Sequence, residues 1–287
     1  MIPLKDNIPT RKPALVTYVI IALNIAVFIF FQQALFGKYG GFSSAGNPER
    51  VVHFTFIPYR LSHPGSACGL KAEVEGQIVN SPNGQPLCSG EVETFTDTAT
   101  GATVRARVGR VIDHNEPSVW FTIFAAMFMH GGVLHIAGNM LFLWIFGNNV
   151  EDAMGKAKFI GFYLAGGLVA AFAQFLAGPN AAVPTLGASG AIAAVLGGYA
   201  LLYPKARVIT LIFIIFFVTI FELPALIVLG GWFLFQLLDA SSQPLGGGGG
   251  VAYFAHIGGF LFGLLVIKLL ATQYDPYYDR RGRPPVY

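Results

Sequence analysis

Long apolar stretches separated by short polar segments run through most of the chain. The first, Ala14–Phe36, has 23 residues without a charged side chain, and about 20 apolar residues in a helix suffice to cross ~30 Å of hydrocarbon. It is too long for the apolar core of a signal peptide and no small-residue cleavage site follows it, so we expect it to be retained. Together with the later stretches it predicts six membrane crossings. The later stretches are Val133–Phe146, Phe159–Ala177, Ser189–Tyr203, Val208–Leu238 and Ala252–Ala271.

The Val208–Leu238 stretch does not fit a single element, because its 31 residues are too many for one straight crossing and too few for two. Glu222 and Pro224 divide it. We expect an interfacial segment over Val208–Phe221, followed by a crossing over about Leu223–Leu238. One long tilted helix is the alternative.

The distribution of lysine and arginine sets the orientation, because short cytoplasmic loops collect these residues. With the N-terminus inside, eleven of the 18 lysines and arginines lie on inner segments. The short outer loops Gly178–Ala188 and Ala240–Gly250 hold none, and the other seven lie in Gly37–Ser118, which is long enough to escape the rule. We therefore expect both termini of this multi-pass protein in the cytoplasm, and we expect the membrane to be the plasma membrane.

The predicted fold is that of an all-α polytopic membrane protein, a bundle of six transmembrane helices with one small extracytoplasmic insert. The insert, 37–118, carries runs of β-type residues between glycine-containing turns and is expected to contain β-structure. Helix one, 14–36, precedes it, and helices two to six form a core over 119–272. The flanks are a cytoplasmic segment, 1–13, and a cytoplasmic tail rich in arginine, proline and tyrosine, 273–287.

Cys68 and Cys88 are the two cysteines of the sequence, and both fall in the insert. In an oxidising compartment they can form one disulfide, which would close a loop of about 21 residues and stabilise it by about 3 kcal/mol. The alternative is two free thiols in a poorly ordered loop.

Composition narrows the class of protein further. Hydrophobic residues make up 54% of the chain and charged residues 11%, against about 25% charged in soluble domains. These values exclude a disordered chain. Because the net charge of +3 leaves no basic face for phosphates, we expect no nucleic-acid partner. The expected partner is the lipid bilayer, and no cofactor and no metal are predicted.

Ser189 and His256 are polar residues predicted to lie at similar depths below the outer membrane surface. Ser189 begins a 15-residue stretch that ends just before Lys205 and Arg207, which places the serine roughly 8 Å below the hydrocarbon boundary. His256 is the fifth residue of its crossing and lies about 6 Å down by the same helical rise. If the two side chains meet, the histidine can take the serine proton and turn the hydroxyl into an attacking nucleophile.

Small residues follow both side chains at helical spacing, which lets two membrane helices approach closely. We therefore expect these two helices to pack and to bring the hydroxyl and the imidazole together. The motif around the serine is weak by itself and also fits a passive serine in a helix-packing run. The small residues are Ala193 and Gly197 after the serine, and Gly259 and Gly263 after the histidine.

His135 and Asn139 lie four residues apart and so share one face of the second predicted helix. Both can donate hydrogen bonds, and the oxyanion of a tetrahedral acyl intermediate needs such donors. His130 is expected to lie in the preceding loop and to be structural. A zinc site built from His130, His135 and His256 is an alternative that the lack of an HExxH motif or a cysteine pair disfavours.

Three motifs occur in order along the chain: MHGGVLHIAGN over Met129–Asn139, GASG over Gly187–Gly190 and AHIGG over Ala255–Gly259. Together they resemble the rhomboid family of intramembrane serine proteases, and the likeness runs from the first crossing to the sixth. The resemblance implies a catalytic dyad of Ser189 and His256 without an acidic third member. It also implies oxyanion donors at His135, Asn139 and the backbone N–H of Ser189, with His130, Gly187, Gly259 and Gly263 in support.

The resemblance further implies a serine endopeptidase that cleaves single-pass transmembrane proteins near the outer end of their helices. Two positions depart from the family pattern: no arginine follows Trp120, where many members carry a Trp-Arg pair, and Ala193 stands where an aromatic often stacks on the histidine. The first bears on loop anchoring and the second on the orientation of His256. The alternatives are a catalytically weak or dead relative that binds and escorts membrane helices, and a small transporter, which would be expected to show paired repeats.

Overall fold

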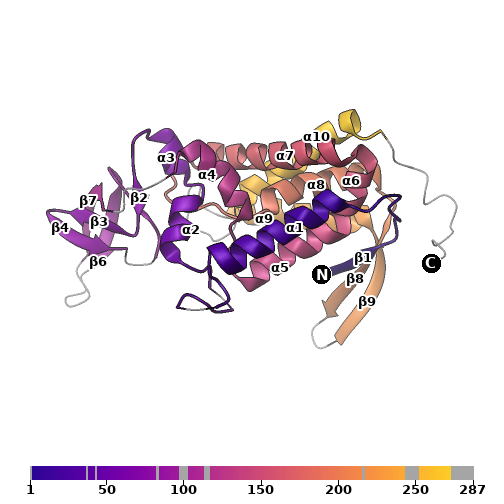
Figure 1. Ribbon diagram of the computed structural model, residues 1–287, viewed down its shortest axis with the longest axis horizontal. Coiled ribbons are helices and arrows are strands. Elements are labelled where there is room, and N and C mark those ends of the chain that lie inside the picture. The colour runs from indigo at the N-terminus through magenta and orange to yellow at the C-terminus, as the bar shows by residue number, and fades with distance from the viewer. Residues whose placement is uncertain are drawn as a thin grey trace.

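The structure, a computed structural model, describes residues 2–36, 38–42, 44–81, 84–96, 103–112, 117–214, 217–242 and 252–272. Figure 1 shows a bundle of helices with a small group of strands at each end. We call the end with the insert the insert face. The opposite end, with strand β1 (Ile2–Asp6) and the last turn of helix α10 (Tyr253–Leu270), is the terminal face. The expected tail, 273–287, lies outside the described residues.

Four of the described helical segments are long and apolar enough to cross a membrane. These segments fit a polytopic helical membrane protein, and the expected total of six crossings stays a prediction. One is the continuous segment Val133–Met154, in which a π-helical turn joins α5 to α6. The bounds are α5 (Val133–Phe142), α6 (Asn148–Met154), α7 (Lys156–Ala177), α9 (Ala225–Ser242) and α10.

Three further apolar helical segments are shorter. Helix α1 (Leu15–Ala26) continues into a π-helical turn (Val27–Phe31), within the stretch expected to be the first crossing. Helix α8 (Ser189–Leu202) matches the expected short helix. Helix α4 (Val119–Ala125), followed by a 3₁₀ turn (Ala126–Phe128), was not expected from the sequence, because its apolar run is too short to cross a membrane.

Helix α8 lies at the centre of the bundle, with most of its side chains buried against α10, α7 and neighbouring segments. Its contact with α10 is especially close: a Cβ added at Gly197, Gly259 or Gly263 would overlap backbone atoms of the facing helix. The small-residue faces predicted from the sequence therefore meet, which places the start of α8 next to the start of α10.

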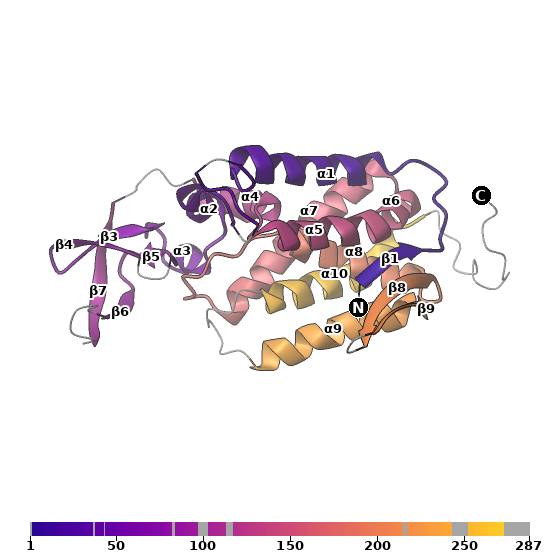
Figure 2. The ribbon, with the colours of Figure 1, turned by 90° about the horizontal axis from the view of Figure 1, so that it is seen from below.

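Helix α9 runs along one side of the bundle beside α10 (Figure 2). Many of its large apolar side chains are exposed, including Leu226, Ile227 and Leu234, as expected for a surface that faces lipid. Among its buried residues, Gln236 is the polar one.

The insert begins with two short helices, α2 (Pro48–Phe54) and α3 (Pro58–Ser62), and continues as short strands. The strands are β2 (Cys68–Gly69), β3 (Lys71–Val74), β4 (Gln77–Asn80), β5 (Leu87–Cys88), β6 (Val92–Thr96) and β7 (Thr103–Val111). Four of them form an antiparallel sheet in the order β4-β3-β7-β6, and β2 pairs with β5.

The disulfide between Cys68 and Cys88 joins β2 to β5, as predicted. Both cysteines are fully buried in a cluster with Val52, Ile57 and Tyr59 from the preceding helical segment. The bridge therefore ties β2 to β5 inside the apolar cluster through which the strands of the insert pack on the preceding helical segment.

Replacing both cysteines by serine is expected to destabilise the insert, because closing a loop of about 21 residues stabilises it by about 3 kcal/mol on the chain-entropy model. A thermal melt of the purified Cys68→Ser, Cys88→Ser variant measures the loss. The native protein melted in reductant is the matched control and should approach the variant. A melting curve that neither change affects would contradict a stabilising bridge.

A three-stranded antiparallel sheet lies at the terminal face, in the order β1-β8-β9, with β8 (Arg207–Ile214) and β9 (Phe217–Pro224). The expectation of an all-α bundle is therefore wrong for this part of the chain. The segment expected to be interfacial, Val208–Phe221, forms most of the β8–β9 hairpin. Its valine, isoleucine, threonine and phenylalanine residues favour strands, and the N-terminal segment supplies β1 as a third strand.

Asp6 links this sheet to the core of the bundle. Its Oδ2 accepts hydrogen bonds from the Tyr199 hydroxyl and from Asn149 Nδ2, each at 2.6 Å. Burial is the main reason that the pKa of Asp6 rises from 3.8 to about 7.

The raised pKa of Asp6 predicts that stability falls as the pH rises from about 4 to about 7, because the folded chain there holds a proton that the unfolded chain has released. Asp6→Asn keeps an oxygen acceptor without the charge and should flatten that dependence. Melting temperatures of both proteins at about pH 5 and about pH 8 test this. The pKa of Glu91 is also raised to about 7, but Glu91 is common to both proteins, so their difference isolates Asp6. Parallel curves would refute the prediction.

Candidate active site

Ser189 and His256 lie in hydrogen-bond contact. Ser189 is the first residue of α8 and His256 lies in the first turn of α10. Ser189 Oγ and His256 Nε2 are 2.7 Å apart, a distance typical of a strong hydrogen bond. His256 is buried and Ser189 is partly buried. The imidazole is therefore placed to take the hydroxyl proton.

The loop that leads into α8 is held by backbone hydrogen bonds. Gly187 N–H donates to the Ala126 carbonyl at 2.8 Å, and Phe56 and Thr185 exchange two backbone hydrogen bonds. Gly187 has a φ of +118°, and a Cβ at this position would lie 2.9 Å from the ring of His135. Both the backbone conformation and the close ring require glycine here.

His135 and Asn139 lie on α5 beside this loop. His135 Nδ1 accepts a hydrogen bond from Gly131 N–H at 3.2 Å, so its Nε2 carries the proton and can donate on the side of Gly187. Asn139 Nδ2 is buried near Gly187 and has no hydrogen-bond partner among the described residues. The backbone N–H groups that begin α8 also lack acceptors within the helix. Three kinds of donor thus gather next to Ser189.

His130 is fully buried, and the Gln32 side chain holds its backbone through two hydrogen bonds of 2.9 Å. Its ring meets the ring of His135 edge to face, with centroids 5.2 Å apart. It therefore lies behind His135 rather than in contact with Ser189. Over the ranges that the structure describes, no three histidine, cysteine, aspartate or glutamate side chains are grouped to hold a metal ion.

Two residues of α9 complete the surroundings of His256, and neither was expected from the sequence. Gln236 Oε1 is 2.6 Å from His256 Nδ1, and the Trp232 ring centroid is 5.7 Å from that of the imidazole. Ala193, where an aromatic would be usual, is fully buried. A signal for Gln236 did exist: it is the one amide in the apolar stretch Leu223–Leu238, and a polar group inside a membrane needs a partner.

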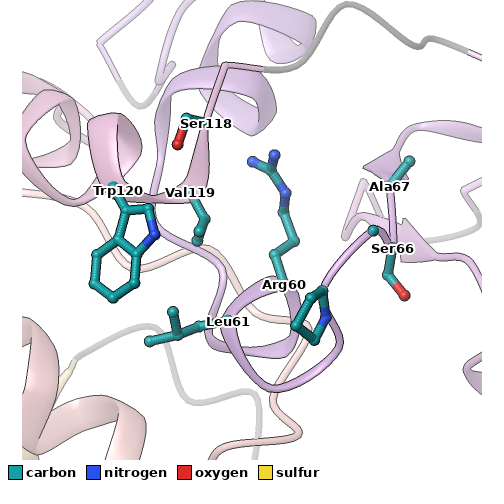
Figure 3. Close-up of a pocket in the computed structure, with 9 residues that line it drawn as sticks. Arg60, Leu61, Ser66, Ala67, Ser118, Val119 and Trp120 are labelled. Carbon is teal, nitrogen blue, oxygen red and sulfur yellow. The ribbon is translucent and has the colours of Figure 1, made fainter.

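A cavity of about 450 Å³ lies on the insert face between α3 and the start of α4 (Figure 3). The Arg60 side chain extends toward Ser118, and Trp120 lines the same cavity beyond Val119. Arg60 Nη2 donates to the Pro117 carbonyl at 2.8 Å. An arginine therefore anchors the segment that enters α4, although none follows Trp120 in the sequence.

A smaller cavity of about 30 Å³ lies directly beside Ser189. Its volume exceeds the ~10–15 Å³ of probe-occupied volume that one water molecule needs. Residues from the loop, α7, α8 and α10 form its walls, including Gly187, Ala170 and Ala255. The cavity provides room for a small group next to the serine hydroxyl.

The fold and the site together describe a helical membrane bundle with a serine and a histidine in contact at the start of two closely packed helices. The rhomboid domain profile matches residues 117–273, more than half of the chain, so the chain belongs to the rhomboid family. All candidate catalytic, oxyanion and supporting residues named from the sequence fall inside the matched range, whereas Cys68 and Cys88 do not. The strands of the insert lie outside it.

Similar proteins carry rhomboid names. The chain is 31% identical over 167 residues to Rhomboid protein 1, mitochondrial, of Saccharomyces cerevisiae, covering 56% of this chain and 44% of that protein. It is 31% identical over 149 residues to Presenilin-associated rhomboid-like protein A, mitochondrial, of Danio rerio, covering 49% and 35%. It is 37% identical over 108 residues to Rhomboid protease GluP of Bacillus subtilis, covering 38% and 20%. The chain thus spans less than half the length of these relatives.

The expected location needs a correction. The expected location is the plasma membrane, but the yeast and zebrafish relatives are both named as mitochondrial. The plasma-membrane expectation is therefore wrong on this comparison, while the membrane-spanning character stands. The physical reason is that charge on loops reports orientation relative to a membrane and carries no information about which membrane it is.

Proposed function

We propose that the chain is a serine endopeptidase that hydrolyses a peptide bond near one end of single-pass transmembrane helices. The observation that carries the proposal is the 2.7 Å contact between Ser189 Oγ and His256 Nε2. The catalytic unit of the proposal is the core, 119–272, and the insert, 37–118, is an appendage to it. The mitochondrial relatives support a location in a mitochondrial membrane.

In the proposed reaction, Ser189 Oγ attacks the scissile carbonyl while His256 Nε2 takes its proton. The oxyanion that forms accepts hydrogen bonds from Asn139 Nδ2, His135 Nε2–H and the N–H of Ser189. His256 then gives the proton to the leaving amine. In the second half of the reaction, water attacks the acyl carbonyl while His256 takes a proton from the water, and His256 returns that proton to Ser189 Oγ as the carboxylic acid product leaves. The donor arrangement around Gly187 supports this assignment.

A helical substrate must unwind locally, because its carbonyls are hydrogen-bonded within the helix. The site begins at the insert-face ends of α8 and α10, so the bond that is cut is proposed to lie near the corresponding end of the substrate helix. The alternative function is a weak or inactive rhomboid-like protein that binds and escorts membrane helices. That protein would need no reactive serine.

Activity-based labelling separates the two functions. A fluorophosphonate reacts when the serine oxygen attacks phosphorus, fluoride leaves and the imidazole takes the proton. We expect labelling of the detergent-solubilised protein at Ser189, located by mass spectrometry, and no labelling of His256→Ala. An unlabelled but folded protein would favour the escort function, and labelling at another serine would contradict the proposed nucleophile.

A further inference from the structure

The hydrogen bond between Gln236 and His256 determines which imidazole nitrogen carries the proton. An amide oxygen can only accept, so His256 Nδ1 must be the protonated nitrogen that donates to Gln236 Oε1 at 2.6 Å. The lone pair of Nε2 is then directed at Ser189 Oγ. We propose that Gln236 is a positioning residue that holds His256 in the tautomer and orientation required by the base. This inference rests on the proposed function.

Burial makes this hydrogen bond hard to replace. Gln236 and His256 are each only 9% exposed, so water is poorly placed to accept from Nδ1 if the amide is lost. Trp232 lies one helical turn before Gln236 and packs near the imidazole, so α9 holds the ring from two directions. With alanine at position 193, α8 offers no aromatic for this purpose. The restraint on the histidine therefore comes from α9.

Removal of the acceptor tests the proposal. Gln236→Leu keeps a side chain of similar size and is expected to lower kcat by about 10–100-fold, the usual effect of losing an outer partner of a functional histidine at metal sites. KM should stay unchanged, the melting temperature should fall only modestly because one buried donor loses its acceptor, and Gln236→Glu, which keeps an acceptor, should recover most of kcat. Leu237→Ala, at an exposed neighbouring position on α9, is the matched control and should behave like the native protein.

A spectroscopic measurement does not depend on turnover. In protein labelled with ¹⁵N-histidine, His256 should show the Nδ1–H tautomer, and Gln236→Leu should lose that signature; His256→Ala identifies the resonance. Full kcat in Gln236→Leu with an unchanged spectrum would overturn the positioning role. Ser189→Ala distinguishes this from failure of the proposed function, because cleavage by Ser189→Ala would refute the nucleophile whatever Gln236 does.

An independent inference concerns the sheet at the terminal face. Residues paired across a sheet share a face, and Ile2, Leu211 and Ile220 form one such row across β1, β8 and β9. Ile2 is 39% exposed and Ile220 is 60% exposed, and Val218, two residues along β9, is 59% exposed. The opposite face carries Asp6, which is buried against the core. The core contact at Asp6 therefore leaves the row of Ile2, Leu211 and Ile220 on the face of the sheet that points away from the core.

The position of the sheet identifies what covers this face. Strand β9 ends at Pro224 and runs directly into α9, a helix of membrane-spanning length whose first turn exposes Leu226 and Ile227. The hairpin projects from the side of the bundle end (Figure 1) and lies beside the end of α9 (Figure 2), so the exposed apolar side chains of β9 adjoin those of the first turn of α9 along the chain. We propose that the apolar face of the sheet rests on the bilayer surface at the terminal face.

The depth and lipid type follow from the backbone and the charges. Within the described residues β1 and β9 are the edges of the sheet, and free backbone edges do not occur in hydrocarbon, so the sheet lies at the level of the headgroups. Lys5 and Arg207 are exposed at the base of the same sheet, where they can meet anionic headgroups. Arg207 lies 3.6 Å from the equally exposed Glu222, which limits but does not remove this positive charge.

Spin labelling of the full chain tests the proposal. Ile220→Cys is labelled without reductant, so that the native disulfide stays closed, and reconstituted in vesicles of phosphatidylcholine mixed with phosphatidylglycerol. The label should collide more often with lipid-soluble oxygen than with a water-soluble nickel chelate. Ile78→Cys, on the insert sheet and 71% exposed, is the matched control and should show the reverse.

If water or a second copy of the chain covers this face instead of lipid, the measurement gives a different result. Equal nickel access at positions 220 and 78 would overturn contact with lipid. Spin–spin broadening that disappears on dilution with unlabelled protein would indicate a second copy of the chain on this face and would also overturn the proposal. In vesicles of phosphatidylcholine alone the label at position 220 should lie shallower, and an unchanged depth would refute the role of anionic lipid.

Discussion

Ser189→Ala is expected to abolish cleavage of a transmembrane-helix substrate, and His256→Ala is expected to do the same. The first removes the attacking oxygen, and the second leaves the hydroxyl without a base at 2.7 Å. In a well-studied serine protease such losses cost on the order of 10⁶-fold in kcat, and they do not add because the two groups act as a unit. Turnover of a quenched substrate in proteoliposomes measures the loss, and the double variant should be no worse than either single one.

Controls separate chemistry from folding in this first prediction. Ser189→Ala removes one oxygen and leaves the packing of α8 on α10 intact, so its melting temperature should stay close to that of the native protein. Ser241→Ala, at an exposed position on α9, is a matched substitution outside the site and should retain activity. Cleavage by purified Ser189→Ala would show that another group is the nucleophile.

The contact between serine and histidine could be predicted because it depends on local pattern. Small residues at a spacing of four on two apolar segments define faces that can pack closely, and the helical rise sets their depths. The structure places Gly197, Gly259 and Gly263 in that contact, with no room for a Cβ. The long helices could be predicted because their apolar runs are long enough to cross a membrane. The disulfide could be predicted because Cys68 and Cys88 are the two cysteines of the sequence.

Other features depend on contacts between distant parts of the chain. The terminal sheet needs β1 to pair with β8 some 200 residues later, and an apolar run that can form a strand resembles one that can form a helix. Arg60 lies 57 residues before Pro117 and reaches it through the fold of the insert, so the residues around Trp120 give no sign of this contact. Gln236 was visible as an isolated amide, but its partner became evident only when α9 was placed beside α10.

Asn139→Ala and His135→Ala are expected to depress kcat strongly with little change in KM. Asn139 Nδ2 is buried beside Gly187 without a hydrogen-bond partner among the described residues, so it is free to donate to charge that develops during the reaction. Removing one such donor costs about 10²–10³ in kcat, or ~2.7–4 kcal/mol, in a characterised serine protease. The interaction forms only in the transition state, so binding of substrate should be unaffected.

A structural role for these two side chains predicts a different outcome. If Asn139 and His135 mainly held α5 against the loop, their loss would lower the melting temperature and raise KM together. His135→Ala is the more demanding case, because its ring also contacts His130 and accepts from Gly131 N–H. Asn148→Ala, in the same helical segment but at the terminal face, is the matched control and should keep native kcat. Values of kcat, KM and melting temperature for each variant decide between the roles: near-normal kcat in both would leave the oxyanion to backbone donors alone.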